Sequence, residues 1–532
     1  MTTSLCLGRL ALPGDGGGVT SVRRLNPVAL AHLPAGVKRP AYDIDAISTG
    51  IVHLGLGNFH RAHQAAYTDE VLKQDPRWGI CGVSLKSRGV VEALRVQDGL
   101  YTVVAKHGDA NGSSAQARIV GSVRETLCGA GNMAQVIARM AAPATRIVSL
   151  TITEKGYCHD PASGRLNFAH PDIAHDLAAG FVHGGTPRSA PGAILLALQA
   201  CKALVPRVSG GLTILSCDNL PHNGRTLEGL MHELADAADP TLSAWMRDHV
   251  TFPSTMVDRI VPATTAQDIA DTEALIGVHD AAPVMTEPFT QWVIEDRFAA
   301  GRPAWEDAFP NAGGGAQFVA DVAPFELMKL RLLNAAHSAM AYLGYLAGHE
   351  FIYQASADPL FAAMIERLWR EVSPTLPALP IDVQQYQRDL MQRFRNTALP
   401  HGTWQIAMDG SQKLPQRILH TVRDCLSAGT PVDILALVVA GWMRYVSGTN
   451  EQGRWIDVRD PLSDELARIA SATRGSTSAL CERLLGLGAI FGGDLPHVEM
   501  FSSKVQTHLE SLLARGVNAT LTNALTGACV GQ

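Results

Sequence analysis

Four polar side chains between residues 326 and 337 are spaced so that they lie on one side of a helix. They are Glu326, Lys329, Asn334 and His337. At about 100° per residue they span an arc of about 140°. A buried lysine with a lowered pKa can give a proton to a carbonyl oxygen or take one from an alcohol, while asparagine and histidine stabilise a developing alkoxide. The spacing also fits a solvated helix face, on which Glu326 and Lys329 form a weak ion pair.

A glycine pair follows a short apolar run and opens a helical pattern. The run is residues 51–54, and Gly55 and Gly57 come directly after it. In dinucleotide-binding folds the first glycine permits a tight turn, and the second lets a pyrophosphate approach the backbone at a helix N-terminus. His60 stands where a third glycine is usual, so an ordinary glycine-rich turn stays open as the alternative. The candidate cofactor-binding residues are Gly55, Gly57, Asn58, Phe59 and Arg61, whose guanidinium is expected to face phosphate.

Basic residues stand at the end of the next predicted strand, where an NAD-binding fold usually carries an acidic residue for the ribose hydroxyls. Lys86, Ser87 and Arg88 occupy this place, after the apolar residues of the run 79–85. Cations here can accept the 2′-phosphate of NADP, and they can equally be solvated loop charges. Both NAD and NADP therefore stay open for a dinucleotide bound at this turn.

These candidates lie on a chain whose first part alternates strands with helices. Apolar runs predict strands at 51–54, 79–85, 146–152 and 212–216, with another approaching Met256, and helical spacing marks 190–204 and 225–237. Such alternation is typical of a parallel, doubly wound α/β sheet of Rossmann type. After about residue 320 only helical spacing persists, at 324–346, 359–371, 383–397, 414–428, 432–447 and 476–487.

The same patterns divide the chain into three parts. Glycines and prolines before residue 45 indicate a loosely ordered N-terminal extension. We therefore expect an extension over 1–45, a dinucleotide-binding Rossmann-type domain over 46–318 and a mainly α-helical substrate-binding domain over 319–532.

Length and composition describe an ordinary folded protein. With 532 residues the chain is longer than a single compact core usually holds, so two domains are expected. Its hydrophobic content of 46% is ordinary for a folded protein. Its formal charge of −6 argues against a general nucleic-acid binder. The nine cysteines form no CxxC pair and lack zinc-ligand spacing, which indicates a reducing compartment and no metal site. We find no signal-peptide core and no run long enough for a bilayer, so we expect a cytoplasmic protein without a membrane partner.

The spacing Lys329-x4-Asn334-x2-His337 resembles the signature of the polyol-specific long-chain dehydrogenases, the mannitol dehydrogenase family. Further blocks are similar to family blocks in the same order, at 55–63, 151–157, 216–219 and 256–259, and the resemblance extends from about residue 48 to about residue 500. It implies a Rossmann-type domain followed by a mostly helical one, with the active site between them. It also implies NAD as the cofactor, with NADP not excluded, and chemistry without a metal.

The resemblance implies a role for each matching residue. Lys329 is implied as the general acid/base, with Asn219 and Asn334 holding the reacting oxygen. Glu326 is implied to relay protons between Lys329 and water. The implied ligands of the neighbouring substrate hydroxyls are His337 and Asp258.

Within the family, three blocks look closest to the branch that interconverts D-fructuronate and D-mannonate: residues 287–296, 404–417 and 440–445. A sugar acid carries a carboxylate, and a buried carboxylate calls for a cation. We nominate Lys413 and Arg417 as its ligands, with surface charges at a helix entrance as the alternative. The other candidate functions are a mannitol 2-dehydrogenase or D-arabinitol 4-dehydrogenase acting on uncharged polyols, and a non-catalytic nucleotide-binding sensor. The oligomeric state stays open.

Overall fold

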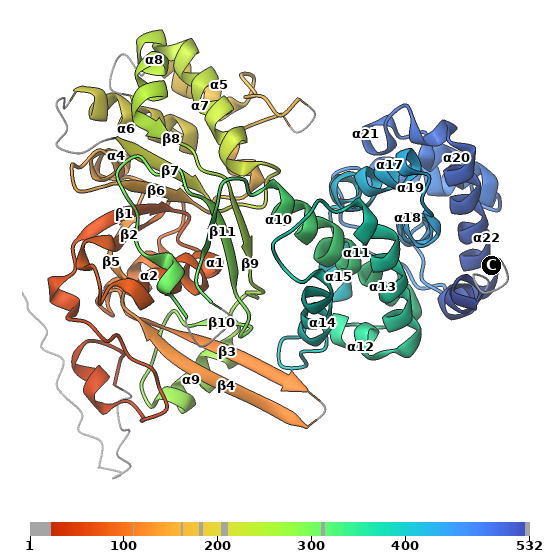
Figure 1. The fold of residues 1–532 in the computed structure, drawn as a ribbon, viewed down its shortest axis with the longest axis horizontal. Helices are drawn as coiled ribbons and strands as arrows, with labels where there is room; N and C mark the ends of the chain where they lie inside the picture. The colour runs from red at the N-terminus through yellow and green to blue at the C-terminus, as the bar shows by residue number, and fades with distance from the viewer. Residues whose placement is uncertain are drawn as a thin grey trace, which may run out of the picture.

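The computed structural model describes residues 23–109, 111–160, 163–179, 185–203, 211–309 and 314–526. These residues fold into two lobes, an N-terminal lobe built around β-sheets and a C-terminal lobe made of helices (Figure 1). Helix α10 (Ala323–Met328) lies where the two lobes meet and begins the helical lobe.

The centre of the N-terminal lobe is a six-stranded sheet in which all paired strands are parallel. Its order is β5 (Val123–Cys128), β2 (Gly79–Ser84), β1 (Thr49–Leu54), β6 (Ile147–Leu150), β7 (Leu212–Ser216) and β8 (Val250–Thr251). The predicted Rossmann-type sheet is therefore confirmed. Four of its strands are those expected at 51–54, 79–85, 146–152 and 212–216.

Neighbouring residues of a strand pack on opposite faces of this sheet, because successive side chains point to opposite sides. Val52 and Leu54 join one buried cluster, and Ile51 joins another. The first cluster includes α4 (Met133–Met140), α5 (Pro171–Ala179), α6 (Ala190–Ala203), α7 (Asn223–Ala238) and α8 (Pro240–His249). The second includes α1 (Asn58–Ala62), α2 (Gln64–Val71) and α3 (Gly89–Arg95). Burial on both faces explains the nearly continuous apolar runs of these strands.

Two smaller sheets extend the N-terminal lobe. The antiparallel hairpin of β3 (Tyr101–Asp109) and β4 (Gly112–Val120) is joined by β10 (Val284–Thr286) and projects from the central sheet (Figure 1). Strand β9 (Thr255–Asp258) pairs antiparallel with β11 (Gln291–Glu295), which also pairs with β12 (Gln317–Val319). The strand predicted near Met256 therefore exists but lies outside the parallel sheet, because its pairing partner is β11. Helix α9 (Ala266–Ile276) packs beside β4.

Residues 23–45 pack against the N-terminal lobe, which corrects the expectation of a loosely ordered segment there. The N–H of Leu25 donates to the carbonyl oxygen of His279 at 2.9 Å. The 3-10 turn η1 (Val28–His32) lies within the segment, and η2 (Ile44–Ala46) lies at its end. Its apolar side chains Leu25, Ala29, Leu33 and Val37 share a buried cluster with residues of the lobe that include Leu100 and Ile119. The remainder of the expected extension, residues 1–22, lies outside the described residues.

The C-terminal lobe is helical, as predicted. Its helices α11 (Ala335–Ala347) and α18 (Asp433–Val446) are buried along almost their whole length and form its centre. Around them lie α12 (Ile352–Ala357), α13 (Pro359–Val372), α14 (Val383–Phe394), α15 (Thr403–Ala407), α16 (Gly410–Leu414), α17 (His420–Ala428), α19 (Ser463–Ala472), α20 (Thr477–Leu485), α21 (Gly488–Phe491) and α22 (Glu499–Thr526). Across the described ranges, none of the helices combines the length and apolarity needed to cross a bilayer.

Candidate active site

Lys329 begins a π-helical turn inside the helix that the sequence predicts over 324–346. The segment consists of α10, the π-helical turn η6 (Lys329–Asn334) and α11, and the N–H of Ala335 donates to the carbonyl oxygen of Leu330. The helix predicted over this segment is therefore present, and it contains one π-helical turn. Because a π-helix bonds residues five apart, Lys329 and Asn334 stand one such turn apart on the same side. Single π turns inside α-helices are frequent at functional sites.

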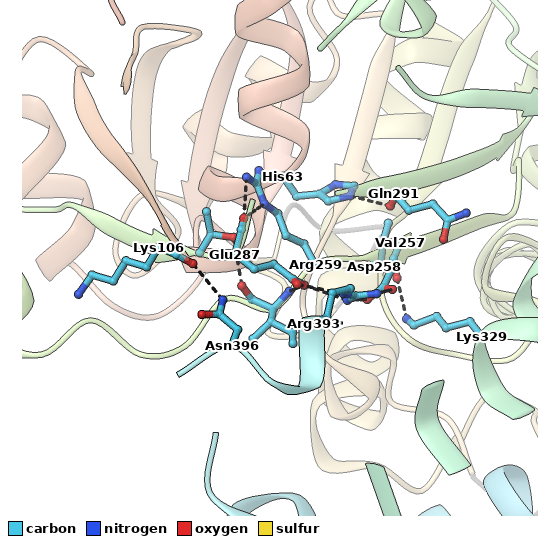
Figure 2. A network of polar contacts seen from close by, with 12 residues as sticks. His63, Lys106, Val257, Asp258, Arg259, Glu287, Gln291, Lys329, Arg393 and Asn396 are labelled. Atoms are coloured by element: carbon cyan, nitrogen blue, oxygen red, sulfur yellow. Dashed lines mark hydrogen bonds and ion pairs between the residues drawn. The ribbon is translucent and has the colours of Figure 1, made fainter. Parts of the chain in front are cut away.

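The ammonium group of Lys329 is buried and points into the N-terminal lobe. Its Nζ donates to Oδ1 of Asn219 at 2.7 Å and to the carbonyl oxygen of Val257 at 2.6 Å (Figure 2 labels Val257 and Lys329). Asn219 follows β7, and Val257 lies on β9. Burial lowers the pKa of Lys329 below that of an ordinary lysine; Asp258 opposes this shift, and Arg417 adds to it. A lysine in these surroundings can exchange a proton with a bound oxygen.

Glu326 lies one turn before Lys329, with its carboxylate bound to the N-terminal lobe. Both carboxylate oxygens accept from the N–H of His222, at 3.0 and 3.2 Å. Burial raises the pKa of Glu326, while His222 and Lys329 oppose that rise. His222 itself is exposed, so Glu326 stands between the buried lysine and the surface.

His337 lies in the first turn of α11 and is 7% exposed. Its ring is 5.7 Å from that of His401 and 4.8 Å from that of Phe394, measured between ring centroids. Burial lowers the pKa of His337 well below its usual value, and the neighbouring cations Arg417 and Arg393 act in the same direction. The imidazole is therefore neutral near pH 7 and offers one hydrogen-bond donor and one acceptor.

Asp258, at the end of β9, is joined to an arginine that the sequence did not reveal as part of the site. Arg393 of α14 donates to both carboxylate oxygens of Asp258, at 2.7 and 3.0 Å, and to both of Glu287, at 2.8 and 2.9 Å (Figure 2). Its guanidinium also lies 3.9 Å from the ring centroid of Phe289. The carboxylate predicted to bind substrate hydroxyls is thus already paired with a cation, which holds the pKa of Asp258 below its usual value against the effect of burial.

The two cations nominated for a carboxylate lie on a segment that packs against η6 and α11. Arg417 is in the π-helical turn η8 (Pro415–Leu419), and among the described residues its guanidinium makes a single hydrogen bond, to Oγ of Ser338 at 3.3 Å. Lys413 of α16 donates to the carbonyl oxygens of Ile406 and Met408, at 3.2 and 2.6 Å. In the described part of the chain, neither side chain forms an ion pair with a carboxylate. Burial, with Arg417 beside it, lowers the pKa of Lys413 to about 8.

The glycine pair forms the turn between β1 and α1. Gly55 has a φ of +103°, and a Cβ there would lie 2.0 Å from the carbonyl oxygen of Thr151, so only glycine fits. Gly57 is exposed at the N-cap of α1, where a Cβ would meet nothing closer than 3.9 Å. Open backbone at a helix start beyond a parallel strand fits the pyrophosphate of a dinucleotide.

Three further residues of this turn point elsewhere. Asn58 Nδ2 lies 3.3 Å from the carbonyl oxygen of Pro262, and the ring of Phe59 stacks on that of His63. Arg61 is buried, and its guanidinium donates to the carbonyl oxygen of Ala282 and to the side chain of Asn58. Arg61 therefore does not face a phosphate as expected, because its charge is used to join α1 to the chain before β10.

Asp218 ties together the ends of β6 and β7 beside Asn219, a contact that the sequence did not indicate. Its carboxylate accepts from the N–H groups of Ile152 and Thr153, each at 2.9 Å, and from the hydroxyl of Tyr157 at 2.7 Å. Thr153 has a φ of 64° and a ψ of 163°, a backbone conformation that residues other than glycine rarely adopt. Such strain is held by surrounding contacts and occurs most often at functional sites.

The basic residues after β2 are exposed. Lys86, Ser87 and Arg88 stand beyond the C-terminal end of β2, which pairs with β1 ahead of the glycine turn. Within the described part of the chain, the hydrogen bond of the Arg88 side chain is a 3.4 Å contact to the carbonyl oxygen of Ala130. The positions of these residues agree with the expected ribose end of a dinucleotide site.

Comparison with known proteins covers nearly the whole chain. Residues 49–307 match the mannitol dehydrogenase Rossmann domain, and residues 321–513 match the mannitol dehydrogenase C-terminal domain. The uncharacterized oxidoreductase YeiQ of Escherichia coli (strain K12) is 44% identical over 94% of this chain and 100% of its own length. The D-mannonate oxidoreductase of the same strain is 45% identical over 91% of this chain and 97% of its own length.

A solved structure agrees with these sequence relatives. The ternary complex of Pseudomonas fluorescens mannitol 2-dehydrogenase with NAD and D-mannitol aligns with a TM-score of 0.82 and 37% identity, over 94% of this chain and 99% of that one. Both domains of the family are matched in order, and the relatives align over almost their whole length. This chain therefore belongs to the mannitol dehydrogenase family of oxidoreductases.

Proposed function

We propose that this protein is an NAD-dependent reductase of a sugar acid, which interconverts D-fructuronate and D-mannonate. The observation that carries this proposal is the pair Lys413 and Arg417, two half-buried cations on the segment that packs against η6, which form no ion pair with a carboxylate among the described residues. The 45% identity to a D-mannonate oxidoreductase points the same way.

The energetics of burial explain why these two cations suggest an anionic substrate. Removing a charge from water is costly unless an opposite charge or strong hydrogen bonds compensate it. Arg393 has such compensation from two carboxylates, whereas Arg417 has one long contact to a hydroxyl. A carboxylate on the substrate supplies the missing partner and can be held by two parallel hydrogen bonds.

Lys329 is the proton donor of the proposed reaction. Its ammonium gives a proton to the carbonyl oxygen as that oxygen becomes an alkoxide, and its amine takes the proton back in the reverse direction. Asn219, which accepts a hydrogen bond from Lys329, and Asn334, one π turn away, hold the reacting oxygen. Glu326 passes the proton between the lysine and solvent, and His337 binds a neighbouring hydroxyl.

The glycine turn is the proposed place of the dinucleotide. A bound nicotinamide supplies the hydride in reduction and accepts it in oxidation. Gly55 and Gly57 allow the pyrophosphate to approach the backbone, and the strained Thr153 shapes the neighbouring strand end. NAD is the proposed cofactor, since the aligned mannitol 2-dehydrogenase structure contains it; NADP is the alternative suggested by Lys86 and Arg88.

A second candidate is a dehydrogenase of uncharged polyols, favoured by the TM-score of 0.82 to a complex that contains D-mannitol. Initial rates of NADH and NADPH oxidation with D-fructuronate and with D-fructose distinguish the two. We expect D-fructuronate to be turned over with the higher kcat/KM. A preference for D-fructose would replace the sugar-acid proposal with the polyol one. Absence of turnover with either, in a protein that still binds NADH, would favour the nucleotide-binding sensor.

A further inference from the structure

The two acceptors of the Lys329 ammonium come from separate segments of the N-terminal lobe. Asn219 follows β7 of the central sheet, whereas Val257 lies on β9, which belongs to a different sheet. Pairing between neighbouring strands of one sheet therefore does not set the distance between these acceptors. A contact that joins the two segments is needed to place the ammonium between them.

Asn223, the first residue of α7, joins the two segments through its side-chain amide. Its Nδ2 donates to the carbonyl oxygen of Asp218, the residue before Asn219, and to that of Thr255, two residues before Val257, each at 2.9 Å. Its Oδ1 accepts from the N–H of Thr255 at 2.9 Å. The amide thus uses both its N–H groups and its oxygen, and Asn223 is only 1% exposed.

The local sequence brings the start of α7 close to the chain before β9. Gly224 follows Asn223, and a Cβ at this position would lie 2.5 Å from the carbonyl carbon of Pro253, so a glycine is needed for the approach. A second link joins the same two segments, because the hydroxyl of Thr255 donates to the carbonyl oxygen of Ser216 at 2.7 Å. The end of β7 and the start of β9 are therefore held together at two points.

We propose that Asn223 is a positioning residue of the reaction, which fixes the separation of Asn219 and Val257 and thereby places the ammonium of Lys329. This inference rests on the proposed acid/base role of Lys329 and is independent of the choice between a sugar acid and a polyol. The preceding residue, His222, donates its N–H to Glu326, so one short segment is bonded both to the proposed proton relay and to the backbone beside the two acceptors.

The test compares Asn223→Leu, which removes the three hydrogen bonds at similar volume, with Gln97→Met as a matched control. Gln97 is also fully buried in the N-terminal lobe, and its amide also makes three hydrogen bonds, at 2.7, 2.9 and 2.9 Å. Both variants should lose stability. We expect kcat of Asn223→Leu to fall by about 10–100-fold with D-fructuronate and D-fructose alike, since a small misplacement of a reacting group is costly. Gln97→Met should keep kcat, and NADH affinity measured by fluorescence should change little in either variant.

The pH dependence separates a misplaced Lys329 from a general loss of stability. Hydrogen bonds to the ammonium favour its charged form, so weaker bonds to the two acceptors lower the pKa of Lys329 further. Ketone reduction needs the charged form, which is lost as the pH rises through this pKa. With the same substrate, the alkaline fall in kcat/KM should therefore begin at a lower pH in Asn223→Leu than in the unchanged protein. The charged groups that act on Lys329 are the same in both proteins: Asp258, Arg417, Arg393 and Glu326.

An unchanged kcat and pH profile in Asn223→Leu, or a loss of kcat no greater than in Gln97→Met, would overturn the inference. If Asn223→Leu does not fold, Thr255→Val decides, because it removes the second link at nearly equal volume. Its kcat should fall less, with the same direction of pH shift, and unchanged kinetics would then overturn the inference. A failure of the proposed function looks different, since Lys329→Met would itself keep its turnover.

Discussion

Arg393 and Asp258 form a two-point ion pair between the helical lobe and the N-terminal lobe, with nitrogen-to-oxygen distances of 2.7 and 3.0 Å. Arg393 is 7% exposed and Asp258 6%, so the pair is shielded from solvent. Glu287 accepts from the same guanidinium, which makes Arg393 the common partner of two buried carboxylates (Figure 2). This cluster holds α14 against the end of β9, next to the strand residue that accepts a hydrogen bond from Lys329.

Replacing Arg393 should destabilise the protein more than replacing any exposed arginine. Arg393→Met leaves Asp258 and Glu287 buried without their cation, which costs about 3–5 kcal/mol. Urea denaturation followed by circular dichroism measures the loss, with Arg388→Met as the control because Arg388 lies on the same helix and is exposed. Equal midpoints for the two variants would show that the buried cluster contributes nothing to stability.

Replacing Lys329 should remove catalysis and spare nucleotide binding. Lys329→Met deletes the proton donor while keeping most of the side-chain volume, so kcat should fall by about 10²–10⁴-fold. NADH affinity, measured by fluorescence titration, should change little, because the glycine turn lies on a different lobe. Lys73→Met, at an exposed position of the N-terminal lobe, is the control. Undiminished turnover by Lys329→Met would rule out the acid/base assignment.

The pH dependence should distinguish acidic from neutral substrates. Lys413 has a pKa of about 8 and carries its positive charge below that value. The charge is lost as the pH rises through about 8, so kcat/KM for D-fructuronate should fall there, beyond any change that Lys329 imposes on both substrates. The ratio of kcat/KM for D-fructuronate to that for D-fructose removes the shared part. A ratio that stays constant from pH 6 to pH 9, or that has the same pH dependence in Lys413→Met, would contradict a role for Lys413 in carboxylate binding.

Cofactor preference depends on the exposed cations after β2. Arg88→Ala should weaken NADPH binding more than NADH binding, because only NADPH carries a 2′-phosphate for the guanidinium to meet. Dissociation constants from fluorescence titration at low and moderate salt measure both. If neither affinity changes, Lys86 and Arg88 are solvated charges with no part in cofactor choice.

Local sequence determined the elements of this protein well. Apolar runs predicted β1, β2, β6 and β7, since strands buried on both faces need continuous apolar side chains. The glycine turn was recognisable because Gly55 occupies a backbone conformation that other residues avoid. Helical spacing predicted the C-terminal lobe. In the N-terminal lobe, the hairpin of β3 and β4 was not predicted.

The tertiary structure alone decided which residues meet. Arg393 lies 135 positions from Asp258, and Arg61 lies 221 positions from the carbonyl oxygen of Ala282 that it contacts. No local pattern encodes such pairs, because they depend on how two lobes pack. The sequence named Lys329 as a candidate base. The lowering of its pKa, however, depends on burial against Asn219 and Val257, which only the assembled fold provides.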